Sequence, residues 1–142
     1  LLEEKQFQIQ FYMSDDMVYT DQRGLRFLLR QIISNSIKYC GNEPELNFTS
    51  LERDGCYIFA IRDNGIGVRS CDLPYLFEKG FTGDSGKERK KATGMGLYLA
   101  KEMARELNIT LHVKSEWKKG FEIQISFPMV DSTADSNQLP PG

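Results

Sequence analysis

The chain has 142 residues, of which 40% are hydrophobic and 27% are charged, a balance typical of one globular domain with an ordinary core. Its net charge of -2 excludes binding by bulk electrostatics, so we expect no nucleic-acid partner and no membrane contact. The three cysteines form no C-x-x-C pair, which argues against a disulfide framework and against a zinc site.

The two ends of the chain differ from its middle. There is no initiator Met and no signal-like start, which predicts a segment of a longer protein. Residues 131–142 contain few apolar side chains and two prolines, so we expect a disordered tail after a domain over residues 1–130.

The first elements are a strand and a long helix. Residues 7–13 alternate apolar and polar side chains, which predicts a strand. Residues 20–41 carry apolar side chains at helical spacing. Thr20 or Asp21 would cap the start of this helix, and Gly41 would close its end.

A hairpin and a long connection follow. Residues 45–51 and 56–62 are predicted strands, and Asp54-Gly55 between them is a strong signal for a hairpin turn. Residues 68–93 have little periodicity, and we expect one short helical turn there, near residues 73–78. A connection of this length in a compact domain is usually functional or mobile.

The last elements are an amphipathic helix over residues 97–107 and two alternating segments, 109–115 and 121–127, joined by a turn at 116–120. The element order predicts an α+β fold with two layers. We expect about three helices on a mixed, mostly antiparallel sheet of about five strands.

Polar residues lie along one face of the long helix. Gln31, Asn35 and Lys38 are spaced i, i+4, i+7, and Asn35 lies at the edge of the apolar stripe, where an amide needs a partner. Asn35 is either a structural amide bonded to a neighbouring loop or a ligand for a hard cation, with Lys38 beside a phosphate.

Two glycine-rich stretches break the pattern. Asp63 ends a strand and is followed by Gly65 and Gly67, which is either a simple turn or a carboxylate for a ligand amine beside a backbone that a flat ring can approach. Gly94 and Gly96 precede a helix, whose first N–H groups can bind an anion. This stretch lacks the third glycine of a dinucleotide fingerprint and the Gly-Lys-Ser/Thr of a P-loop.

The order and spacing of these motifs resemble the catalytic, ATP-binding domain of sensor histidine kinases. DNA gyrase, the mismatch-repair ATPase and the ninety-kilodalton heat-shock chaperone belong to the same wider group, which shares the Bergerat ATP-binding fold. The resemblance covers about residues 7 to 128. Its motifs are an N-box at 31–39, a first glycine box at 63–67, a phenylalanine-box-like segment at 74–81 and a second glycine box at 94–97.

The resemblance implies that the chain binds ATP with Mg²⁺. Asp63 would receive the exocyclic amine of adenine, while Gly65 and Gly67 would let the purine lie against the turn. Asn35 would bind Mg²⁺, and Lys38 would contact phosphate. Tyr39 would pack on the purine ring or the ribose, with plain core packing as the alternative.

The resemblance also implies an ATP lid over residues 80–94, with Phe77 and Phe81 anchoring its base. Lys79 would contact phosphate, as would the glycine box of Gly94, Gly96 and Leu97. The basic residues of the lid are alternatively a solvated charge run.

Gln31 departs from the family pattern, because many relatives carry Glu there. Glutamine cannot take up a proton at neutral pH, which argues against general-base catalysis by this residue. It would instead orient the acceptor or a metal-bound water.

His112 is the single histidine, and it lies in a predicted strand out of phase with the apolar residues. The resemblance therefore implies a kinase domain that does not phosphorylate itself alone. The acceptor histidine would lie on a separate dimerisation and phosphoacceptor domain, with a response regulator as the next partner. The parent would be a bacterial inner-membrane sensor with this domain in the cytoplasm. The alternatives are an anti-sigma-type serine/threonine kinase of the same fold and a catalytically silent interaction domain.

Overall fold

The computed structural model of the chain describes residues 7–12, 18–81 and 95–128. The elements follow one another in the predicted order, with boundaries that shift by up to three residues. They are β1 (Gln8–Tyr12), α2 (Gln22–Lys38), β2 (Glu45–Arg53), β3 (Cys56–Asp63), the 3-10 helix η1 (Leu73–Tyr75), α3 (Gly96–Glu106), β4 (Thr110–Glu116) and β5 (Gly120–Pro128). The expected tail at 131–142 and most of the expected lid lie outside the described residues.

The five strands form one sheet with the order β1-β2-β3-β5-β4. β1 pairs with β2 in parallel, whereas the other three pairs are antiparallel. The parallel pair is possible because α2 provides the crossover that a β-α-β unit requires. The predicted α+β class with a mixed, mostly antiparallel sheet is confirmed, although the described residues contain two α-helices and η1 rather than three full helices.

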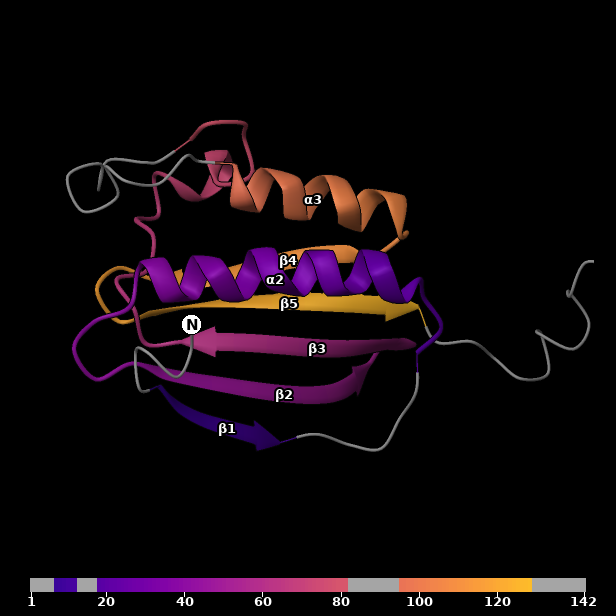
Figure 1. Ribbon diagram of the computed structural model, residues 1–142, viewed down its shortest axis with the longest axis horizontal. Helices are drawn as coiled ribbons and strands as arrows, with labels where there is room; N and C mark the ends of the chain where they lie inside the picture. The colour runs from indigo at the N-terminus through magenta and orange to yellow at the C-terminus, as the bar shows by residue number, and fades with distance from the viewer. Residues whose placement is uncertain (1–6, 13–17, 82–94, 129–142) are drawn as a thin grey trace, which may run out of the picture.

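Both α-helices lie side by side over one face of the sheet (Figure 1). Leu28 and Ile32 of α2 are fully buried against Ile61 of β3 and Ile123 of β5. These side chains stand on the helix-facing side of the sheet because alternate residues of a strand point to the same face. The core therefore lies between the helix layer and the sheet, and it includes residues of β2, β3, β5 and β4.

Gly24 allows the two helices to approach closely near the start of α2. A Cβ atom on this residue would lie 2.7 Å from Cδ2 of Leu107 and 3.1 Å from Sδ of Met103. Gly24 weakens the first turn of α2, but the missing side chain leaves room for Met103 of α3 and for Leu107 at the end of that helix.

The two ends of α2 differ in how well the sequence predicted them. The Asp21 side chain accepts a hydrogen bond from the Arg23 N–H at 3.2 Å, so the predicted N-cap is confirmed. The predicted C-terminal role of Gly41 is wrong, because the helix ends at Lys38 with Tyr39 as its cap. The Tyr39 carbonyl leaves the helix and accepts a hydrogen bond from the Ile66 N–H at 3.3 Å. Helix termination is therefore set by docking onto the first glycine box.

The turn between β2 and β3 is the predicted hairpin turn. Asp54 and Gly55 both have positive φ angles, of 52° and 77°. Two such residues in sequence are the signature of a type I′ turn, whose twist matches the flanking strands.

Candidate functional site

The sequence motifs meet at one end of the molecule. The C-terminal end of α2, the last residue of β3, the start of α3 and the turn between β4 and β5 lie together at the left of Figure 1. Oε1 of Gln31 lies 3.7 Å from the position of a Cβ atom on Gly96, so the N-box face reaches the start of α3. The structure thus brings together residues that are more than sixty positions apart in the chain.

Asp63 is a buried carboxylate, only 6% exposed, at the end of β3. Its Oδ2 accepts a hydrogen bond from Oγ of Ser36 at 2.7 Å, and its Oδ1 accepts one from the Gly65 N–H at 2.9 Å. A charge buried to this extent needs such donors, because it has lost its water. The predicted site residue Asp63 is therefore held from two sides, by a helix and by its own loop.

Ser36 is one of the residues at this site that the sequence motifs did not indicate. It is 3% exposed on α2, although it is polar. It follows Leu28 and Ile32 at intervals of four, so it continues the buried stripe of the helix. A hydroxyl on an apolar stripe was the signal that could have found it.

Gly65 and Gly67 have an unexpected structural role. A Cβ atom on Gly65 would lie 2.5 Å from the carbonyl oxygen of Tyr39. Gly67 has φ +70°, and a Cβ atom there would overlap the Glu116 carbonyl and lie 2.7 Å from the Gly120 carbonyl. At both glycines, other parts of the chain's own backbone therefore lie where a side chain would be. Their predicted contact with a purine stays a prediction.

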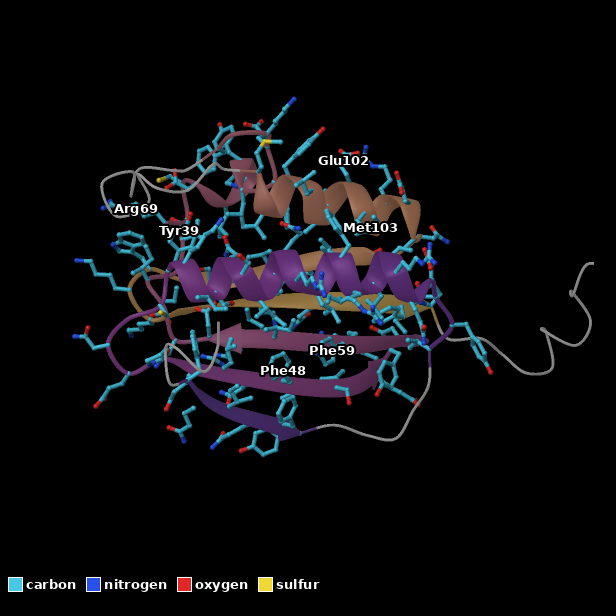
Figure 2. All side chains as sticks on the ribbon, in the orientation of Figure 1. Tyr39, Phe48, Phe59, Arg69, Glu102 and Met103 are labelled. Atoms are coloured by element: carbon cyan, nitrogen blue, oxygen red, sulfur yellow. The ribbon has the colours of Figure 1, made fainter. Side chains whose placement is uncertain are left out.

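The turn between β4 and β5 supports the loop that follows Gly67. Oγ of Ser115 accepts a hydrogen bond from the Val68 N–H at 2.7 Å and donates one to the Gly120 carbonyl at 2.9 Å. The Arg69 guanidinium lies 4.6 Å from the ring centre of Trp117, a cation–π distance. Figure 2 shows Arg69 at the same end of the molecule as Tyr39.

Asn64, between Asp63 and Gly65, also has a structural role. Its Oδ1 accepts a hydrogen bond from the Glu45 N–H at 2.9 Å, and its Nδ2 donates one to the Glu43 carbonyl at 3.0 Å. The amide therefore fastens the first glycine box to the start of β2.

The polar face of α2 carries the predicted metal and phosphate residues. Asn35 is half-buried, and its side chain makes no hydrogen bond to another of residues 7–12, 18–81 and 95–128. The described residues therefore give no support to the alternative that Asn35 is a structural amide bonded to a neighbouring loop. Lys38 is exposed in the last turn of the helix. Tyr39 is half-buried directly after it.

The donors of this site suit a cation that a ligand helps to bind. In the described part of the chain, no three His, Cys, Asp or Glu side chains gather where they could hold a metal ion. Mg²⁺ commonly keeps several waters and is bound by one or two protein groups together with phosphates of a substrate. The single amide oxygen of Asn35 fits that mode and does not fit an all-protein cage.

The second glycine box opens α3. Gly96 is the first residue of this helix, and the Leu97 side chain is 7% exposed within the core. Gly94 lies outside the described residues, so its predicted contact with phosphate stays a prediction. Lys79 is exposed after η1.

Of the two phenylalanines expected to anchor the lid, Phe77 lies against the core, whereas Phe81 contacts the exposed Tyr75 and is not part of the core cluster. Phe77 packs against the core, and Nζ of Lys101 lies 5.5 Å from its ring centre. The Phe81 ring lies 6.0 Å from the Tyr75 ring.

A hollow of about 250 Å³ lies beside the β4–β5 turn. It is lined by side chains that include Arg62, Lys114 and Glu122. These three residues share one cross-strand row on the sheet face opposite the helices.

Among the described residues, no helix has the length and apolar character needed to span a membrane.

Residues 20–131 match the family model described as "Histidine kinase-, DNA gyrase B-, and HSP90-like ATPase". This match covers most of the chain, so the chain belongs to that family. The similarity inferred from the N-box and the two glycine boxes is thereby confirmed.

Two curated relatives are sensor kinases of staphylococci. The chain is 37% identical over 115 residues to the sensor protein kinase GraS of Staphylococcus aureus (strain JH1), covering 81% of the chain and 33% of the relative. It is 34% identical over 117 residues to the sensor histidine kinase GraS of Staphylococcus epidermidis, covering 82% of the chain and 34% of the relative. The chain thus spans about a third of the length of these relatives.

Solved structures show the same fold at low sequence identity. A mycobacterial sensor histidine kinase, MprB, superposes with a TM-score of 0.75 at 19% identity, covering 89% of this chain and 85% of that one. The catalytic domain of the histidine kinase ThkA superposes with a TM-score of 0.72 at 15% identity, covering 89% and 81%.

Proposed function

We propose that this chain is a histidine-kinase catalytic domain that binds Mg-ATP and transfers the γ-phosphoryl group to a histidine. The histidine lies on a separate dimerisation and phosphoacceptor domain of a longer protein, which then passes the group to a response-regulator aspartate. The observation that carries this proposal is the buried Asp63, held by Ser36 and Gly65 beside the polar face of α2.

The carboxylate of Asp63 recognises the base. As an acceptor at the end of a buried strand, it is suited to the exocyclic amine of adenine, because the amine supplies a donor to a site without water. Tyr39, which caps α2 beside the same loop, packs on the purine or the ribose.

The phosphates are bound farther along α2 and at α3. Asn35 would bind Mg²⁺ through its amide oxygen. The cation would neutralise the negative charge that develops on the phosphates. Lys38 and Lys79 contribute positive charge from the last turn of α2 and from the segment after η1. The second glycine box, from Gly94 to Leu97, offers backbone N–H groups at the start of α3.

Gln31 cannot act as a general base, since its amide takes up no proton at neutral pH; it would instead orient the acceptor or a metal-bound water. Its position near Gly96 favours this role, because the γ-phosphoryl group would lie between α2 and α3. Positioning and charge stabilisation then account for most of the catalysis, as is usual for phosphoryl transfer.

The acceptor comes from outside this chain. His112 is exposed on β4 and pairs in register with Gln124, on the sheet face that carries Lys114. The helices and Asp63 lie on the other face, since Leu111 and Val113 alternate with His112. The acceptor histidine is therefore proposed to lie on another domain. Since the curated relatives are sensor kinases, we also propose that the chain is the cytoplasmic domain of a bacterial inner-membrane sensor.

The direct test is calorimetric titration with a non-hydrolysable ATP analogue, with and without Mg²⁺. The unaltered chain is expected to bind, Asp63→Asn to lose detectable binding, and Asn35→Ala to lose mainly the metal-dependent part. Equal affinity in all three proteins would refute both residue assignments.

A second assay separates a histidine kinase from a serine/threonine kinase. The chain alone, incubated with Mg-ATP, is expected to take up no phosphate, and the parent protein is expected to form an acid-labile phosphoprotein. An acid-stable product would instead indicate a serine or threonine acceptor.

A further inference from the structure

Ser36 and Asp63 form a buried pair that joins α2 to β3. They are 27 residues apart in the chain, both are more than nine-tenths buried, and Oγ of Ser36 lies 2.7 Å from Oδ2 of Asp63. We propose that Ser36 is a positioning residue, which fixes the Asp63 carboxylate as an acceptor and so makes the site selective for purines with a 6-amino group. This inference rests on the proposed nucleotide site.

The direction of the hydrogen bond defines what the pair can do. The serine hydroxyl is the donor, and Oδ2 of Asp63 is the acceptor. A serine within a helix often donates to the carbonyl four residues earlier instead. Here the hydroxyl of Ser36 points out of α2 toward β3 and bonds to Asp63.

A second donor fixes the plane of the carboxylate. The Gly65 N–H donates to Oδ1, while Ser36 donates to Oδ2, so each oxygen is bonded to a different element. Rotation about the Cβ–Cγ bond of Asp63 would break both bonds. The two donors therefore set the direction in which the carboxylate can accept a further hydrogen bond from a ligand.

The position of Ser36 also couples the two ends of the site. Asn35, which is assigned to the cation, is the residue immediately before it on α2. Consecutive helical residues point in directions about 100° apart, so one residue reaches β3 while the other remains on the polar face. The same helical turn thus holds the base anchor and the metal ligand at a fixed separation.

The chemistry of the base turns this positioning into selectivity. A 6-amino purine donates a hydrogen bond to the fixed carboxylate, whereas a 6-oxo purine presents an acceptor to it. A site built to bond one polar group rejects the analogue that lacks it, because buried groups are left without partners. Without the Ser36 hydroxyl, Oδ2 loses a donor while Oδ1 keeps the Gly65 N–H, so the carboxylate is held less firmly and the penalty for the 6-oxo group falls.

The experiment compares the affinities of Mg-ATP and Mg-ITP for the chain and its variants by calorimetry. Ser36→Ala is expected to weaken ATP binding about tenfold, the usual order for a hydrogen bond to a charged group, with little change for ITP. The ratio of the two affinities therefore falls about tenfold. Ser36→Cys, which fills the same space with a weak donor, is expected to give an intermediate ratio.

Ser34→Ala is the matched control, because it makes the same change two residues earlier on α2. It is expected to leave the ratio unchanged. A purely structural role for Ser36 would weaken both nucleotides equally, and an unchanged ratio in Ser36→Ala and Ser36→Cys overturns the inference. Failure of the unaltered chain to bind ATP at all would instead overturn the proposed function.

Discussion

The carbonyl group of Tyr39 occupies the space that a side chain on Gly65 would need. A Cβ atom on Gly65 would lie 2.5 Å from the Tyr39 oxygen and 3.0 Å from Oδ1 of Asp63. The neighbouring Ile66 N–H donates a hydrogen bond to the same oxygen. The end of α2 and the first glycine box are therefore packed backbone against backbone, and the placement of Asp63 depends on this contact.

Gly65→Ala is expected to destabilise the fold by about 1–3 kcal/mol, the usual cost of overpacking, because a backbone carbonyl cannot move aside as a side chain can. Nucleotide affinity should fall with it, since Asp63 shares the loop. Chemical denaturation and a binding titration would measure the two effects. Gly41→Ala is the control, because a Cβ atom there has no neighbour within 4 Å. Equal stability of the two variants would contradict the role given to Gly65.

Ser115→Ala removes the hydroxyl that joins the Val68 N–H to the Gly120 carbonyl. The loss is expected to be about 1–3 kcal/mol in the free energy of unfolding, because the N–H of a buried residue is left without its acceptor. Amide hydrogen exchange at Val68 should become faster. Ser126→Ala on β5 is the control and should change the stability by less than about 0.5 kcal/mol. Unchanged exchange at Val68 would argue against the bond.

Arg69→Ala tests the contact between the loop and the β4–β5 turn. Trp117 is the single tryptophan of the chain, so the indole emission comes from this residue alone. We expect a change in the emission spectrum and a loss of about 0.5–1 kcal/mol, the usual range for an exposed cation–π pair. Arg53→Ala, an exposed arginine at the end of β2, should leave the emission as it is. Identical spectra for the two variants would show that Arg69 does not lie over the indole in solution.

Asn64→Ala removes both hydrogen bonds that fasten the first glycine box to the start of β2. Each such bond contributes about 0.5–1.5 kcal/mol, so a loss of roughly 1–3 kcal/mol is expected in a denaturation experiment. Asn64→Asp keeps the acceptor and should lose less than Asn64→Ala. Asn42→Ala, an exposed asparagine in the preceding loop, is the control. An Asn64→Ala protein as stable as this control would show that the amide bonds contribute nothing.

The sequence predicted the elements well because their signals are local. Asp54-Gly55 specifies its own turn, and strand alternation is read within a few residues. The strand order and the parallel pairing of β1 with β2 could not be read this way, since they depend on contacts between distant segments. The prediction that Gly41 closes α2 was wrong for the same reason. The helix ends earlier because the Tyr39 carbonyl accepts a hydrogen bond from the distant Ile66 N–H.

The site divides in the same way. Asp63 and Asn35 were identified from motifs, and the structure places both at the same end of the molecule. Ser36 and Ser115 were not identified, because their hydrogen-bond partners are 27 and 47 residues away. Short motifs thus indicate candidate site residues, whereas the hydrogen-bond partners of the residues that hold them in place become visible only in the packed structure.

The position of β5 has a consequence for how the chain is made. β5 is the last strand of the described residues, yet it lies inside the sheet and pairs with both β3 and β4. During synthesis, the β2–β3 hairpin leaves the ribosome long before the strand that must lie beside it. The sheet stays open along β3 until β5 has emerged, and β4 has no partner strand in the sheet before then. A premature stop codon just before Gly120 would therefore remove a central strand, whereas loss of β1 would remove only an edge.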